Sequence, residues 1–248
     1  NYIFNYIIII INEMSYIKIA NIYVKNLYFS LEQVLSKIEE IVKNNSKLQI
    51  VTLNTEMVID SLSDQKFLDI LNKSEIILES NGVCFYANKK YNLKINPING
   101  IDLAEKIISN GYRVFILGTK QEILENAVNN LVKKYPTCNI VGFYNGYFKD
   151  TNEVIDLINK SKAEVLLVGL GSPKQEFWIH DNMDKLNVNV FMGVGGSIDV
   201  WGGYFKRAPY FIKKLKLEWL YRTLQDPKRI KRNLKLVKFL FYFFTNKI

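Results

Sequence analysis

Short apolar runs alternate with longer amphipathic segments along most of the chain. The apolar runs are rich in Val, Ile and Leu and lack polar alternation, which is typical of strands covered on both faces of a parallel sheet. The segments between them have apolar residues at helical spacing, and Gly or Pro marks several of their boundaries. We therefore predict strands at residues 17–24, 48–53, 76–79, 113–117, 139–143, 164–168 and 188–193. The predicted helices cover residues 31–44, 55–62, 65–73, 101–110, 120–134, 151–160 and 174–183.

This alternation predicts an α/β fold, a Rossmann-like open and mostly parallel sheet flanked by helices, over residues 14–203. In such a sheet, ligands bind at the carboxyl ends of the strands. Residues 204–248 have a different pattern and form a predicted helical appendage. Its first helix starts at Pro209 and runs to about residue 224, and its second runs from Asp226-Pro227 to Phe244. The second helix has one apolar stripe, made of Ile230, Leu234, Val237, Phe241 and Phe244.

Composition excludes several kinds of site. The chain has two cysteines, Cys84 and Cys138, and one histidine, His180, so neither a disulfide framework nor a Cys- or His-based metal cluster is expected. It also lacks an Asp-x-Asp pair, the simplest carboxylate site for a divalent cation on a diphosphate. We therefore expect no metal and no cofactor. Residues 3–11 are apolar but too short to cross a bilayer, and we take Met14 as the natural start and assign no function to residues 1–13.

The net charge of +9 is unevenly distributed. Residues 204–248 carry a net charge of +11, whereas the rest of the chain carries −2. A basic segment of this kind indicates an anionic partner, and its aromatic, amphipathic pattern suits a membrane surface better than a nucleic acid. Alternatively, its apolar face docks onto the α/β core, and both arrangements can hold in different states. We expect a cytoplasmic protein peripherally associated with the inner face of the cell membrane, and the sequence leaves the oligomeric state open, a homo-oligomer included.

Four polar or glycine-rich loops follow predicted strands and are candidates for ligand binding. The two glycine-rich turns allow close approach of the backbone to a phosphate or a sugar, and Lys174 adds a positive charge at a helix start. Neither turn matches the dinucleotide-binding or P-loop pattern, which disfavours an NAD-type enzyme. A bound nucleotide diphosphate would have to be neutralised by arginines. The loops are 52–54, 79–82, 169–176 and 193–199, and the arginines are Arg207, Arg222, Arg229 and Arg232.

The loops and arginines occur in an order that resembles the WecG/TagA/CpsF glycosyltransferases (glycosyltransferase family 26). The resemblance extends from Met14 to about Phe244. It is most specific in Gly171-x-Pro173-Lys174-Gln175-Glu176 and in the string Arg207-Ala208-Pro209, Glu218-Trp219-x-x-Arg222 and Pro227-x-Arg229-x-x-Arg232.

The resemblance implies inverting transfer of an N-acetylhexosamine-type sugar, N-acetylmannosamine or a related one, from a UDP-sugar to an undecaprenyl-diphosphate-linked acceptor. This reaction belongs to bacterial cell-surface polysaccharide, capsule or teichoic acid synthesis and uses no metal. On this mapping, Asn81, Thr52 and Gln175 take part in catalysis, and the appendage arginines clamp the diphosphate. The implied substrate-binding residues are Asn54, Gly82, Asp102, Gly169, Gly171, Lys174, Gly193, Gly195, Gly196, Asp199, Arg207, Arg222, Arg229 and Arg232.

The chain departs from the family pattern at Asn81, where the family usually has an Asp that is the proposed general base. An amide has no useful basicity near neutral pH, whereas a positioned carboxylate contributes roughly 10²–10⁴-fold. Either Asn81 only orients the acceptor while another carboxylate takes the proton, or the chain is an impaired homologue that acts as a nucleotide-sugar- and membrane-binding subunit. Deamidation of the Asn-Gly dipeptide to Asp is a third alternative. The alternative carboxylates are Glu79, Asp102, Glu176 and Asp199.

Overall fold

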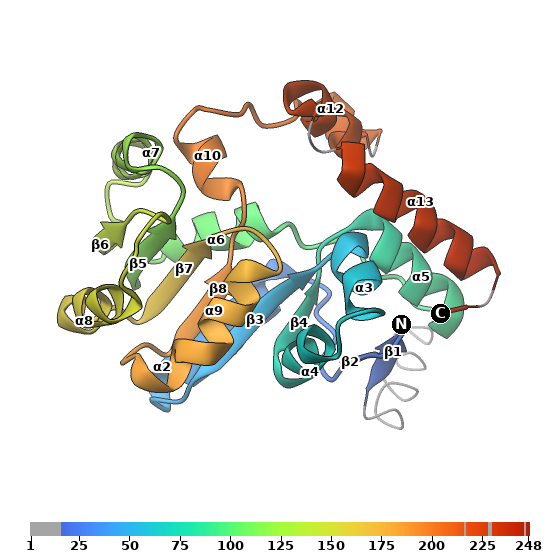
Figure 1. Ribbon diagram of the computed structural model, residues 1–248, viewed down its shortest axis with the longest axis horizontal. Coiled ribbons are helices and arrows are strands. Elements are labelled where there is room, and N and C mark those ends of the chain that lie inside the picture. Colours follow the sequence, from blue (N-terminus) through green and yellow to red (C-terminus); the bar gives the residue numbers. More distant parts are fainter. Residues whose placement is uncertain (1–15, 216, 228–229, 246) are drawn as a thin grey trace.

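The computed structural model describes residues 16–215, 217–227, 230–245 and 247–248 (Figure 1). Within these residues, six parallel strands form one sheet in the order β4-β3-β8-β7-β5-β6, which confirms the predicted α/β fold. The strands are β3 (Leu48–Leu53), β4 (Glu75–Leu78), β5 (Arg113–Gly118), β6 (Asn139–Tyr144), β7 (Val165–Gly169) and β8 (Val190–Gly193).

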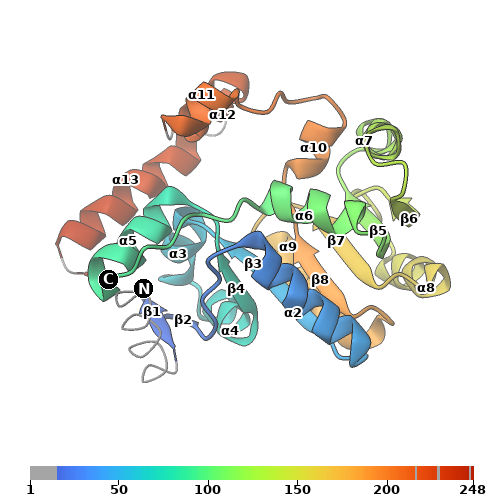
Figure 2. The ribbon, with the colours of Figure 1, turned by 180° about the vertical axis from the view of Figure 1, so that it is seen from behind.

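Helices cover both faces of this sheet (Figures 1 and 2). Successive side chains of a strand point to opposite faces, so Ile116 packs in one apolar cluster and Leu117 in another. This arrangement explains why the strands are apolar without alternation. One face carries α2 (Leu31–Lys43), α6 (Gly100–Ser109), α7 (Gln121–Lys134) and α10 (Ser197–Trp201). The other carries α3 (Thr55–Ser61), α4 (Gln65–Lys73), α5 (Asn81–Tyr91), α8 (Thr151–Ser161) and α9 (Lys174–Asn182), and a 3-10 turn, η1 (Met183–Lys185), follows α9.

Some elements differ from the prediction. The segment predicted as one strand at 17–24 is an antiparallel hairpin of β1 (Ile17–Ile19) and β2 (Ile22–Val24), because the chain reverses at Ala20, which has a φ of 53°. Helix α5 was not predicted, although Ser80 caps its start by accepting a hydrogen bond from the Val83 N–H. The short helix α10 was also missed.

The appendage contains α11 (Tyr210–Lys214), α12 (Glu218–Gln225) and α13 (Ile230–Phe244), so the first predicted helix is in fact two. Helix α13 lies along α3 and α5, and Phe239 on its inner side is fully buried against Tyr86 (Figure 1). Lys235 Nζ also lies 2.7 Å from an Asp60 carboxylate oxygen on α3. The docked side is therefore not the predicted apolar stripe, and the side chains of that stripe are 55–71% exposed. None of the described helices is long and apolar enough to cross a membrane.

Candidate functional site

A cavity of about 620 Å³ lies at the carboxyl ends of the strands. It receives side chains or backbone from the ends of β3, β4, β5, β7 and β8, where ligands bind in sheets of this type. Asp226, which follows α12, also lines it, so the appendage reaches the same cavity. The predicted site residues that line it are Thr52, Asn54, Gly169, Gly171, Gln175, Gly193, Gly195, Gly196 and Asp199.

At one side of the cavity, Thr52 and Glu79 meet at the start of α6. The Gly100 N–H donates a hydrogen bond of 3.1 Å to Glu79 Oε1. A Cβ placed on Gly100 would lie 3.0 Å from Glu79 Oε1 and 3.1 Å from Thr52 Oγ1, so the hydroxyl and the carboxylate approach the same point. Asn54 is adjacent, but its Oδ1 caps α3 by accepting the N–H groups of Glu56 and Met57.

The strand next to β3 in the sheet is β8, and Gln175 holds the turn that follows β8. It is buried, with 3% of its surface exposed, and its Oε1 accepts a 3.0 Å hydrogen bond from the Gly195 N–H. Its Nε2 donates a 2.8 Å bond to Glu176 Oε1, which fixes the orientation of the amide. A Cβ at Gly193 would lie 2.4 Å from Gln175 Nε2, so only glycine permits this approach. Gly195 has a φ of 49°, a conformation that glycine adopts without strain.

Glu176 lies behind Gln175 and does not line the cavity. It is 2% exposed, and its Oε2 is buried without a hydrogen-bond partner among the described residues. Burial raises the pKa of the Glu176 carboxyl and outweighs the hydrogen bond from Gln175. The group is therefore placed to support Gln175 rather than to contact a ligand.

Charged side chains of both signs line the cavity. Asp199 accepts a 2.5 Å hydrogen bond from the Thr119 hydroxyl, which joins the end of β5 to α10. Among the described lining residues, the charged ones are Glu56, Glu79, Asp199, Asp226 and Lys120. Acidic groups predominate, so an anionic ligand would need further cations. No group of three or more His, Cys, Asp and Glu side chains that could hold a metal ion occurs within the described part of the chain.

Several predicted site residues lie outside the cavity lining. Asn81 is exposed at the start of α5, and Lys174 is exposed at the start of α9. Gly82 lies where α5 meets α3, because a Cβ there would be 2.6 Å from Thr55 Cγ2. Asp102 and Arg207 form an ion pair that attaches the start of the appendage to α6. The contacts of Gly82, Asp102 and Arg207 are structural, and the roles of all five residues toward a substrate stay predictions.

The remaining predicted arginines lie outside the part of the site that the structure describes. Arg229 lies outside the described residues. Arg222 and Arg232 belong to α12 and α13, but their side chains are not among those that the structure describes.

Sequence reasoning missed part of the lining. Thr119 has a φ of 49° directly after β5, and Tyr147 lies beyond the end of β6 and is 72% exposed. Both follow strands of a predicted parallel sheet, and that position was the available signal. Tyr204 and Phe205 come from the segment after α10 and carry no such signal.

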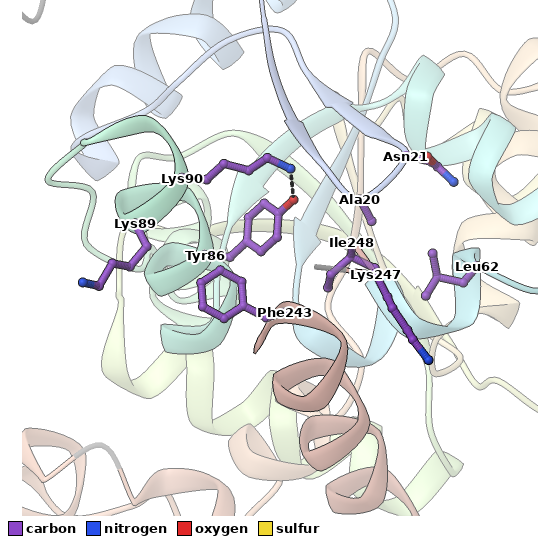
Figure 3. Close-up of a pocket in the computed structure, with 9 residues that line it drawn as sticks. All are labelled: Ala20, Asn21, Leu62, Tyr86, Lys89, Lys90, Phe243, Lys247 and Ile248. Atoms are coloured by element: carbon purple, nitrogen blue, oxygen red, sulfur yellow. Dashed lines mark hydrogen bonds between the residues drawn. The ribbon is translucent and has the colours of Figure 1, made fainter. Parts of the chain in front are cut away.

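A second cavity of about 670 Å³ lies between the β1–β2 turn, α5 and the end of α13 (Figure 3). Lys90 Nζ lies 2.5 Å from the Tyr86 hydroxyl oxygen, whereas the side chains of Lys89 and Lys247 extend away from each other. None of the predicted site residues lines this cavity. The candidate site is therefore the cavity at the strand ends.

The chain is similar in sequence to known proteins. The model of the glycosyl transferase WecG/TagA/CpsF family matches residues 17–248. Proteins from Staphylococcus aureus strains MW2 and NCTC 8325 are each 35% identical to the chain over 218 residues, which is 85% of both lengths. Both are named N-acetylglucosaminyldiphosphoundecaprenol N-acetyl-beta-D-mannosaminyltransferase. The chain therefore belongs to the WecG/TagA/CpsF family of glycosyltransferases.

Proposed function

We propose that the protein transfers an N-acetylhexosamine-type sugar, N-acetylmannosamine or a related one, from a UDP-sugar to an undecaprenyl-diphosphate-linked acceptor. The observation that carries the proposal is the cavity at the strand ends, where the glycine-rich turns and Gln175 meet Thr52 and Glu79. Glycine-rich turns suit a nucleotide diphosphate, and the polar pair suits a sugar hydroxyl. The names of the Staphylococcus relatives support both the sugar and the carrier.

In this proposal, Arg222, Arg229 and Arg232 neutralise the diphosphate without a metal. The charged side chains of the described lining are mostly acidic, so the required cations must come from elsewhere. Asp226 lines the cavity, and Arg222 and Arg229 lie four residues before and three residues after it in the sequence. A guanidinium fork binds phosphate with two hydrogen bonds, which lysine cannot reproduce. Arg222→Lys and Arg229→Lys should therefore raise the KM for the donor at least tenfold, whereas Lys214→Ala on α11 should leave it unchanged.

Transfer of labelled sugar tests the activity. The full-length protein is incubated with a panel of UDP-sugars and N-acetylglucosaminyl-diphosphoundecaprenol, with and without EDTA. We expect one N-acetylhexosamine donor to be used, at a rate that EDTA does not change. Donor binding by calorimetry without turnover of any donor would instead favour the impaired, binding-only homologue.

We also propose that residues 204–248 hold the protein on an anionic membrane surface. Large apolar side chains of α11, α12 and α13 are exposed beside lysines, a combination that suits the lipid interface. The exposed apolar residues of the three helices are Phe211, Trp219, Leu220, Leu224, Ile230, Leu234, Val237, Phe241 and Phe244.

Liposome sedimentation tests this second proposal. The paired change Leu234→Ser and Phe241→Ser removes two side chains that are 63% and 56% exposed, so the fold should persist while binding falls at least tenfold. Val132→Ser is the matched control, because Val132 is 48% exposed on α7, at the other end of the molecule (Figure 1). Equal binding by the paired variant and the control would contradict membrane docking through α13.

A further inference from the structure

Transfer of a sugar to a hydroxyl group requires a proton acceptor. As the acceptor oxygen bonds to the anomeric carbon, the bond from that carbon to the UDP oxygen breaks and UDP leaves with the electron pair. The hydroxyl proton must pass to a basic group within hydrogen-bond reach. Asn81 is an amide and its side chain does not line the cavity, so the structure has to supply this group elsewhere.

The position of each carboxylate decides whether it can accept the hydroxyl proton. Asp102 is paired with Arg207 outside the cavity lining, and Glu176 is buried behind Gln175. Asp199 lines the cavity, but it receives the Thr119 hydroxyl at 2.5 Å and lies beside the glycine-rich turn. Of the four carboxylates that the sequence offered, Glu79 is the one that lines the cavity at the Thr52 side.

The surroundings of Glu79 suit a base. Its backbone N–H bonds to Leu53 O at 3.0 Å, which attaches the loop after β4 to the end of β3. Its Oε1 accepts the N–H of Gly100, the first residue of the ten-residue helix α6, and a helix N-terminus favours a negatively charged group. Gly100 has no side chain to fill the space in which Glu79 Oε1 and Thr52 Oγ1 approach each other.

We infer that Glu79 is the catalytic base, with Thr52 positioning the acceptor hydroxyl beside it. This inference rests on the proposed transfer reaction. Glu79 takes the hydroxyl proton as the new glycosidic bond forms, becomes a neutral carboxylic acid, and returns the proton to water after UDP leaves. The other titratable side chains of the described lining are Glu56, Lys120, Tyr147, Asp199, Tyr204 and Asp226, and the buried Glu176 carboxyl is close enough for its charge to interact with that of Glu79.

Glu79→Gln tests the inference, because the amide keeps the shape and an oxygen acceptor for Gly100 but cannot take a proton. We expect kcat to fall about 10²–10⁴-fold while calorimetric UDP-sugar binding stays within threefold of the unchanged protein. The loss of kcat at acidic pH, which reports protonation of the base, should disappear from the residual activity. Glu39→Gln, an exposed carboxylate on α2, is the matched control and should behave like the unchanged protein.

Three results would overturn the inference. The first is a Glu79→Gln variant that keeps more than a tenth of kcat, and the second is a parallel loss of donor binding. The third is a loss of kcat at acidic pH that persists in the residual activity of Glu79→Gln, because the titrating base would then be another group. Absence of turnover by the unchanged protein with every donor would overturn the proposed transfer reaction and this inference together, whereas the three results above leave the reaction standing.

Discussion

At the scale of single residues, the glycines of the site differ in how much space a side chain would have at their positions. A side chain at Gly193 would meet the Gln175 amide, whereas a Cβ at Gly196 would have its nearest neighbour at 3.7 Å, an ordinary contact. We expect Gly193→Ala to displace Gln175, lower kcat/KM for the donor at least tenfold and cost about 1–3 kcal/mol of stability. Gly196→Ala should have a smaller effect on both kcat/KM for the donor and stability. Steady-state kinetics and urea unfolding compare the two variants, and equal effects would contradict the role of Gly193 in seating Gln175.

Glu176 predicts a pH dependence of stability. Because burial raises its folded-state pKa above the ordinary value of 4.5, its contribution is complete below pH 4.5 and is lost as the pH rises through the folded-state pKa. An amide at this position would not titrate but could still accept the Gln175 amide N–H. The Glu176→Gln variant should therefore gain stability relative to the unchanged protein between pH 4.5 and neutral pH. Urea unfolding of both proteins across this pH range measures the gain. A stability difference between them that does not change with pH would contradict the prediction.

At the scale of elements, the fold was accessible from the sequence because strand and helix patterns are local. The apolar runs at 48–53 and 113–117 became β3 and β5 almost unchanged. Helix α5 was not accessible, since Asn81-Gly82 is a turn signal and the helix is stabilised by packing against distant residues such as Phe239. In the site, positions after strands were predictable, but the neighbours of Glu79 were not, because Gly100 comes from a separate segment.

The docking of α13 was also not predictable from local sequence patterns. Its periodicity indicated one apolar stripe, yet that stripe is exposed and Phe239 on another side is buried, because helix α13 has apolar residues on two sides. Phe239→Ala should cost about 3–5 kcal/mol of unfolding free energy through the lost burial and the cavity left behind. Phe244→Ala, a change at a side chain that is 71% exposed, should stay within about 0.5 kcal/mol. Urea denaturation measures both, and equal costs would contradict the observed docking.

At the scale of the whole molecule, the charge divides the protein into a core of net −2 and an appendage of net +11. Not all of this positive charge is available to a partner. Lys235 is paired with Asp60 on α3, and Arg207 is paired with Asp102 on α6, so these two residues join the appendage to the core. The cations that remain are combined with exposed apolar side chains, which gives the proposed membrane contact both an electrostatic and a hydrophobic part.

The electrostatic and hydrophobic parts of membrane binding should respond differently to salt concentration and lipid composition. Electrostatic attraction to anionic lipid is screened over about 10 Å at 0.1 M salt and about 3 Å at 1 M, whereas burial of apolar side chains is not screened. We expect affinity for liposomes containing phosphatidylglycerol to fall at least tenfold between 0.05 and 0.5 M salt, roughly the range in which screening becomes strong. A weak residual affinity should survive, equal to that for neutral phosphatidylcholine liposomes, and should be lost in the variant with Leu234→Ser and Phe241→Ser. Liposome sedimentation at each salt concentration measures the affinity for anionic liposomes, the affinity for neutral liposomes and the affinity of the double variant. Binding to anionic liposomes that does not respond to salt would contradict the role of the charge.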